Sequence, residues 1–260
     1  MTGLLAERRI VVTGAGRGLG RAVALGLARE GASLTICDRT VAELDAAECE
    51  LREAGANVSA HRLDLADAAA CERFVIDVVE GEGPVDVLVN NAGVLFRAPL
   101  VELTTDTWQQ TLAVNLTAPM ILSRGFLPGM LERGGSIVHL SSRAGALGFV
   151  GETAYCASKF GVEGLTKAMA AELAGTAVSV NSITPGLHIK PTMMTIEDEA
   201  QLPDAERPWR DAAALVPAFV LLARARGAPS GLRFDAQRLA AAVERGGYDL
   251  PEELLEELSE

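Results

Sequence analysis

The sequence has few cysteines, a deficit of positive charge and no apolar run long enough to cross a bilayer. Its four cysteines lack metal-ligand spacing, so we expect no metal site and buried thiols, as is usual in the cytosol: Cys37, Cys49, Cys71 and Cys156. The formal net charge is −12, from 35 acidic and 23 basic residues, and no basic cluster offsets it. Nucleic acid and anionic membranes are therefore poor candidate partners. Residues 1–9 precede no apolar signal-peptide core, and we expect a cytoplasmic protein.

What the chain of 260 residues does contain is a regular alternation of apolar strand patterns and helical patterns. Strands are predicted at 8–12, 33–37, 57–63, 85–89, 136–141, 178–183 and 231–235. Helices are predicted to follow them, one ending at Glu30 and the others at 40–54, 67–80, 104–126, 153–174 and 211–225. This alternation predicts an α/β fold: a doubly wound parallel sheet with helices on both faces, in one domain over residues 1–260.

A glycine-rich loop, T-G-A-G-R-G-L-G at residues 13–20, lies between the first strand and the first helix. In that position small residues let the backbone approach a pyrophosphate, and unpaired N–H groups at the helix start face it, as in a Rossmann fold. The candidate cofactor contacts in this loop are Gly14, Arg17, Gly18, Leu19 and Gly20.

Asp38 ends the second strand, 18 residues after Gly20. A carboxylate there accepts hydrogen bonds from the adenine-ribose hydroxyls and repels a 2′-phosphate, which predicts NAD as cofactor. Asp38 could also be a simple turn residue, and the nearby Arg17 and Arg39 keep NADP open as the less favoured cofactor.

Several polar or small residues stand just past strand ends, where a doubly wound sheet binds its ligands. They are Gly14, Asp38, Asp64, Asn91 and Ser142, and one crevice is expected to collect them. Asn115 lies between apolar neighbours inside the predicted helix 104–126, an unfavourable place unless the amide has a specific partner. A buried asparagine bonding to a neighbouring strand would satisfy the same pattern.

Tyr155 and Lys159 are four residues apart in a predicted helix, so the phenol and the ammonium share one face. A neighbouring cation lowers the pKa of a phenol and suits it to exchange a proton with an alcohol or carbonyl oxygen. The alternative is that Tyr155 and Lys159 form an ordinary pair on a helix surface, without a catalytic role. Cys156 could be mistaken for a nucleophile, but the sequence places no histidine beside it.

Together these residues resemble the short-chain dehydrogenase/reductase family of NAD(P)-dependent oxidoreductases, closely over residues 7–186 and more loosely beyond. The resemblance is carried by T-G-x-x-x-G-x-G at 13–20, Asp64, N-N-A-G at 90–93, Asn115, Ser142, Y-x-x-x-K at 155–159, and Pro185-Gly186. It implies that Tyr155 is the acid/base, that Ser142 holds the substrate oxygen, and that Lys159 binds the nicotinamide ribose and lowers the tyrosine pKa. It further implies a relay water at Asn115, and cofactor contacts from Asp64, Leu65, Asn91, Ala92, Gly93, Tyr155, Lys159, Pro185 and Gly186.

The expected function is NAD-dependent interconversion of a secondary alcohol and a ketone by a homo-oligomer, a tetramer or dimer built on helices 104–126 and 153–174. Two alternatives on the same fold are a nucleotide-binding regulator without catalysis and a lyase resembling the haloalcohol dehalogenases, which replace the nucleotide loop by a halide pocket. The intact loop at 13–20 and the four catalytic positions favour the dehydrogenase.

Two departures from the family pattern concern the substrate side. The threonine expected shortly after Pro185-Gly186 comes only at Thr192, and Phe234-Asp235-Ala236-Gln237 replaces the usual V-D-G-G and continues as helix. Residues 187–210 are expected to cover the crevice, and the tail 248–260 to dock as a short helix capped by Asp249 and Glu252. Candidate pocket residues are apolar (Leu95, Phe96, Leu147, Phe149, Met193, Trp209) or basic (Arg97, Arg143, His188, Lys190).

Overall fold

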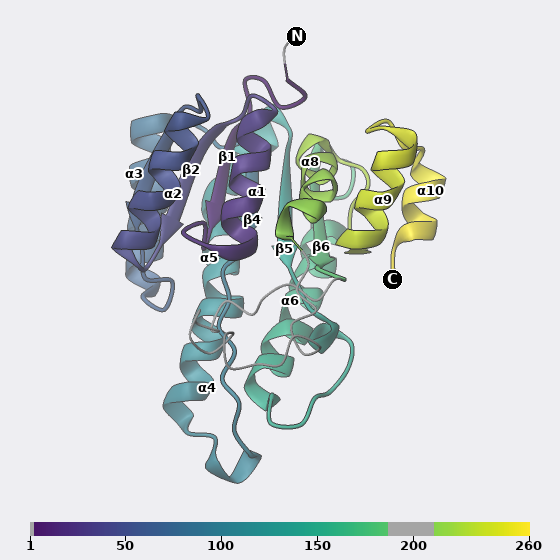
Figure 1. The fold of residues 1–260 in the computed structure, drawn as a ribbon. Helices are drawn as coiled ribbons and strands as arrows, with labels where there is room; N and C mark the ends of the chain where they lie inside the picture. Colours follow the sequence, from purple (N-terminus) through teal and green to yellow (C-terminus); the bar gives the residue numbers. More distant parts are fainter. Residues whose placement is uncertain (1–2, 187–210) are drawn as a thin grey trace.

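A seven-stranded parallel sheet forms the centre of the computed structural model, which describes residues 3–186 and 211–260 (Figure 1). Its order is β3-β2-β1-β4-β5-β6-β7. The strands are β1 (Arg9–Thr13), β2 (Ser33–Asp38), β3 (Val58–Arg62), β4 (Val87–Asn90), β5 (Gly135–Leu140), β6 (Val178–Thr184) and β7 (Arg233–Asp235). The order reverses between β1 and β4, so the predicted doubly wound Rossmann-type sheet is confirmed, with its switch point at the carboxyl ends of these two strands.

The central strands consist of apolar residues that are buried on both sides of the sheet. Ile10, Val11 and Val12 of β1 and the run 87–89 of β4 are at most 1% exposed. A sheet covered on both faces has no solvent-facing side, so its strands are continuous apolar runs rather than alternating ones.

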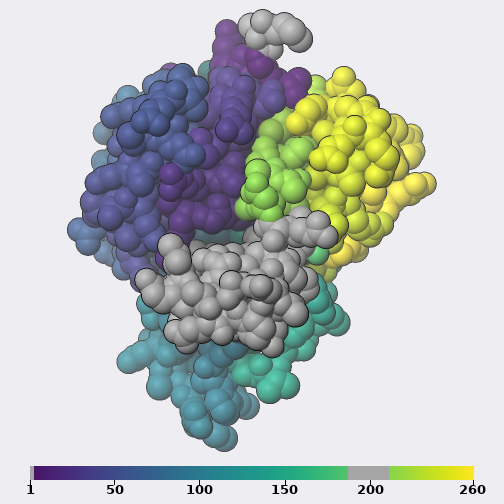
Figure 2. All heavy atoms as spheres, in the orientation of Figure 1, coloured from purple at the N-terminus to yellow at the C-terminus, as the bar shows by residue number. Residues whose placement is uncertain are grey.

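Helices cover both faces of the sheet and enclose two cores. One face is covered by α1 (Gly18–Arg29), α2 (Val41–Glu53), α8 (Val216–Arg224), α9 (Ala236–Gly246) and α10 (Glu252–Leu258). The other is covered by α3 (Ala68–Glu82), α5 (Ala118–Arg133) and α6 (Thr153–Glu172). Figure 2 shows α8 (green) between the amino-terminal elements (purple) and the yellow carboxyl-terminal helices. Within the described residues, no helix is long and apolar enough to cross a membrane.

The predicted helix 104–126 is in fact three segments. It consists of α4 (Thr105–Leu112), a π-helical turn (Ala113–Thr117) and α5, which continues to Arg133. The wider turn contains Asn115, whose side chain bonds to a distant part of the chain, and such turns are frequent at functional sites.

The carboxyl-terminal region follows its prediction in outline. The predicted helix 211–225 is a 3-10 turn (Ala212–Leu215) followed by α8, and the chain after β7 continues directly as α9. The tail docks as α10, with Leu255 buried, but the predicted cap is wrong: α10 begins after Pro251, and Asp249 pairs instead with Arg224 at 2.9 Å. The expectations for residues 187–210 lie outside the described residues.

Candidate active site

The glycine loop between β1 and α1 has a backbone that side chains would disrupt. Gly14 and Gly18 have φ of 64° and 56°, in the left-handed region that favours glycine. A Cβ on Gly20 would clash with the carbonyl oxygen of Gly14 and the Asn91 amide. Because no side-chain cap occupies the first turn of α1, its N–H groups remain available to an anion. The loop therefore fits a dinucleotide pyrophosphate.

The carboxylate of Asp38 lies directly against this loop, at the end of β2. Its Oδ2 accepts a hydrogen bond from Gly16 N at 3.1 Å, and its Oδ1 accepts one from Thr40 N at 3.1 Å. Arg17 faces Glu43, with an Nη1–Oε1 distance of 3.0 Å. The acidic group thus lies beside the expected ribose position, and Arg17 is paired with another carboxylate.

Asn91, the residue directly after β4, connects the end of this strand to the glycine loop. Asn91 donates from Nδ2 to the carbonyl oxygens of Thr13 (2.9 Å) and Gly14 (3.1 Å), and Ala92 N donates to Thr13 Oγ1 at 3.1 Å. The next residue, Gly93, lies between this loop and the catalytic candidates: a Cβ there would be 3.7 Å from Lys159 Nζ.

The third strand brings Asp64 and Leu65 to the same edge of the sheet. Leu63 N donates to the Asp38 carbonyl oxygen at 3.0 Å, which sets the residues after β3 beside the end of β2. Asp64 Oδ1 accepts from Ala66 N at 3.0 Å, and Leu65 packs partly against the core under α3.

Tyr155 and Lys159 share one face of α6, as predicted, with Lys159 Nζ 5.6 Å from the centre of the Tyr155 ring. The ammonium is 2% exposed and donates to the Leu140 carbonyl oxygen at 2.7 Å, at the end of β5. Ser142 follows two residues later, where its Oγ accepts from Ala144 N at 3.2 Å and starts a 3-10 turn (Arg143–Gly145).

Every polar atom of the Asn115 side chain is engaged in the structure. Its Oδ1 accepts from Val94 N (2.8 Å), while Nδ2 donates to Val94 O (2.9 Å) and to Ser158 Oγ (3.0 Å). The π-helical turn thus joins the loop after β4 to the catalytic helix α6.

Burial governs the protonation of the two central groups. It lowers the pKa of Lys159 from 10.5 to about 8, a trend that the carboxylate of Glu163 opposes. It also raises the pKa of Tyr155, against the lowering effect of the Ser142 hydroxyl. The sequence expectation that Lys159 would lower the tyrosine pKa is thus not met in this structure, because desolvation of the phenolate dominates. Glu163, one turn after Lys159, is an influence that the sequence analysis missed.

Pro185 and Gly186 follow β6, and Gly186 borders a cavity. Gly186 has φ of 68°, and a Cβ there would clash with the carboxylate of Asp235. The adjoining cavity has a volume of about 280 Å³ and is lined by Arg143, Ala146, Leu147, Thr184, Gly186, Arg233, Asp235 and Glu260.

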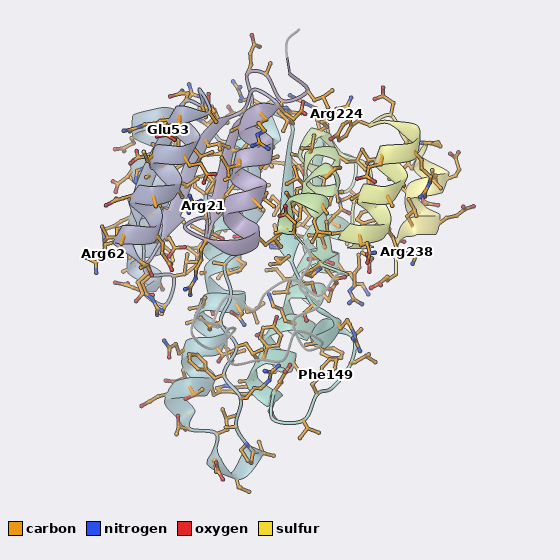
Figure 3. The ribbon with its side chains drawn as sticks, viewed as in Figure 1. Arg21, Glu53, Arg62, Phe149, Arg224 and Arg238 are labelled. Carbon is orange, nitrogen blue, oxygen red and sulfur yellow. The ribbon has the colours of Figure 1, made fainter. Side chains whose placement is uncertain are left out.

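The candidate pocket residues are only partly brought together. Leu147 and Phe149 (Figure 3) are exposed on the loop before α6. The Arg143 guanidinium lies 5.5 Å from the centre of the Phe149 ring. Arg97 pairs with the buried Glu152 at 2.7 Å, so its charge is already compensated. The other basic and apolar candidates in 187–210, with Thr192, lie outside the described residues.

Comparison with known proteins gives the same assignment as the motifs. The family model described as short chain dehydrogenase matches residues 8–202. D-threitol dehydrogenase of Mycolicibacterium smegmatis is 40% identical over 179 residues, which cover 67% of this chain and 68% of that protein.

Two solved structures have the same fold and different bound cofactors. Carveol dehydrogenase from Mycobacterium avium, in complex with NAD, has a TM-score of 0.79 at 28% identity and covers 90% of this chain and 98% of its own. A metagenomic short-chain oxidoreductase in complex with NADP has a TM-score of 0.69 at 39% identity, covering 72% and 86%. The chain belongs to the short-chain dehydrogenase/reductase family of NAD(P)-dependent oxidoreductases.

Proposed function

We propose that the chain interconverts a secondary alcohol and its ketone with NAD, and that Tyr155 is the acid/base. The observation that carries this proposal is the convergence of Ser142, Tyr155, Lys159 and Asn115 on the carboxyl edge of the sheet, next to a glycine loop that fits a dinucleotide. Groups at this edge come from different strands and helices, so a bound alcohol would be reached from several sides.

The cofactor would be held along the carboxyl ends of the first strands. The loop 13–20 would face the pyrophosphate, Asp38 the adenine ribose, Asp64 and Leu65 the adenine, and the stretch 91–93 with Pro185 and Gly186 the rest of the cleft. A bound nicotinamide supplies or accepts the hydride, and the protein positions it and handles the proton.

The proton would be exchanged at the phenol oxygen of Tyr155. In reduction the phenol gives its proton to the carbonyl oxygen of the substrate, and in oxidation the phenolate takes the proton of the alcohol. The Ser142 hydroxyl would donate a hydrogen bond to the same oxygen and hold it in reach. Since its pKa is lowered to about 8, Lys159 can release or recover a proton close to neutral pH. Both Nδ2 hydrogens of Asn115 are used, so its side chain could offer the proposed relay water only Oδ1, which already accepts from Val94 N.

The preference for NAD rests on Asp38 and Arg17. The carboxylate of Asp38, which accepts a hydrogen bond from Gly16 N, would repel a 2′-phosphate. The positive charge of Arg17 is compensated by Glu43. The same intact loop supports a dehydrogenase over the lyase alternative, and the four catalytic side chains support it over an inactive regulator.

The substrate class follows only in general terms from the relatives. One relative is named for D-threitol and another for carveol, a chain polyol and a ring alcohol. For this chain we propose a small secondary alcohol, bound between Ser142, Tyr155 and the loop 95–97. The test is a screen of polyols, cyclic alcohols and their ketones with NAD and NADP side by side, followed by absorbance of the reduced cofactor. Absence of turnover with every class would contradict the proposal.

We further propose one domain and a homo-oligomer. The single sheet runs from β3 to β7 through all the described parts of the chain, which supports one domain. The outer side of α6 carries small residues such as Ala168 and Ala171, and Phe160 there is 50% exposed. Such a face suits packing against the same helix of a second subunit.

A further inference from the structure

Arg233, on the edge strand β7, reaches three different parts of the chain. Its Nη2 donates to the carbonyl oxygen of Ser142 at 3.0 Å. Its Nε is 3.1 Å from Glu163 Oε1, and its Nη1 is 3.2 Å from Glu260 Oε2. The side chain is only 12% exposed, so this guanidinium is a charged group placed inside the protein, directly behind the candidate catalytic serine.

The carboxylate of Glu163 connects Arg233 to α6, the helix that carries Tyr155 and Lys159. Glu163 is 8% exposed and lies one turn after Lys159 on α6. It accepts hydrogen bonds from the hydroxyls of Ser141 and of Ser182, the latter at 2.7 Å. The ion pair between Arg233 and Glu163, next to Ser142, therefore joins the strands β5, β6 and β7 to the helix α6.

A buried ion pair contributes little net stability, because both charges lose their hydration. Well-packed apolar side chains in place of such a pair carry no such cost. The planar guanidinium of Arg233 donates one hydrogen bond, to the Ser142 carbonyl oxygen, and faces the carboxylates of Glu163 and Glu260 as ion pairs, its Nε donating no hydrogen bond. Its rigid fork holds these three directions at once, whereas the donors of a lysine ammonium rotate. The arrangement thus favours a role in positioning over a role in stability alone.

We propose that Arg233 is a positioning residue of the reaction: it fixes the main chain at Ser142, and through Glu163 the neighbouring Ser141, so that the Ser142 hydroxyl is held toward Tyr155. This inference rests on the proposed function, because it assumes that Ser142 and Tyr155 share a substrate oxygen. In this proposal Arg233 acts through Ser142 and not by contact with the substrate.

The cavity of about 280 Å³ beside Arg233 makes a direct test possible. Replacing Arg233 by alanine leaves a guanidinium-shaped space that opens into this cavity. A small guanidinium ion in solution can then enter and restore the missing contacts, whereas a general loss of packing cannot be restored in this way.

The experiment compares Arg233→Ala with the matched control Arg238→Ala, whose side chain is exposed on α9 (Figure 3). We expect the kcat of Arg233→Ala to fall about 10²-fold, as for a misplaced catalytic group, with reduced-cofactor affinity nearly unchanged. Low-millimolar guanidinium chloride should recover a large part of that kcat. Arg238→Ala should keep wild-type turnover and respond to guanidinium as the wild type does.

The variant Arg233→Lys covers the case in which Arg233→Ala does not fold. It keeps a cation beside Glu163 but cannot reach three acceptors, so its kcat should still fall clearly. Wild-type kcat in Arg233→Lys, or in a folded Arg233→Ala, would overturn the inference. A loss of kcat that guanidinium does not restore and that runs parallel with lost cofactor binding would also overturn it. A wild-type protein without any turnover would instead contradict the proposed function.

Discussion

Replacing Lys159 by methionine should make the folded protein more stable at neutral pH. The ammonium of Lys159 is 2% exposed and has one strong partner, the Leu140 carbonyl oxygen at 2.7 Å. Burial lowers its pKa from 10.5 to about 8, so keeping it charged in the folded state costs free energy. Methionine has a similar length and fills the same space without a charge.

The size of the effect follows from the two pKa values. The difference between 10.5 and about 8 corresponds to about 3 kcal/mol. The lost hydrogen bond to Leu140 comes from a charged donor and offsets about 1.5–3 kcal/mol of this. We therefore expect Lys159→Met to unfold with a free energy up to about 1.5 kcal/mol higher than the wild type at pH 7, where the full cost of the charge is present.

The pH dependence has a definite sign. Between about pH 8 and 10.5 the unfolded wild type binds a proton at Lys159 that the folded wild type has lost, so wild-type stability rises with pH relative to the variant. The advantage of Lys159→Met should therefore shrink from pH 7 to pH 10. Urea unfolding of both proteins, followed by circular dichroism at several pH values, measures it. A variant that is less stable by the same amount at pH 7 and pH 10 would refute the reasoning.

Two further predictions concern cofactor choice and assembly. Asp38→Ser should raise kcat/KM with NADP relative to NAD by at least about tenfold, because it removes the carboxylate that would repel a 2′-phosphate. A wild-type protein that prefers NADP would contradict the assignment of Asp38. Phe160→Glu on the exposed side of α6 should lower the molar mass measured by light scattering, because it places charges in the proposed subunit contact. A wild-type protein that is monomeric at micromolar concentration would rule that contact out.

The local parts of the site could be predicted from the sequence because their signals lie close together in the chain. The buried run at 10–12, the glycine loop after it and Asp38 predicted the cofactor edge, and the structure brings them together. The four-residue spacing of Tyr155 and Lys159 likewise gave their common face on α6.

The parts that sequence reasoning missed depend on partners far away in the chain. The π-helical turn at 113–117 accompanies bonds between Asn115 and Val94, and Asp249 pairs with Arg224 rather than capping α10. The pKa of Tyr155 depends on burial by the assembled fold, which outweighs the lowering effect of the Ser142 hydroxyl.

The role of Tyr155 as acid/base is the central claim, and Tyr155→Phe tests it most directly. The substitution keeps the ring that lies beside Lys159 and removes only the oxygen that exchanges the proton. Positioned acid/base catalysis supplies about 10²–10⁴ in rate, so kcat should fall by at least 10²-fold. The affinity for the reduced cofactor, measured by fluorescence titration, should stay near that of the wild type. A Tyr155→Phe protein with near-normal kcat would contradict the account.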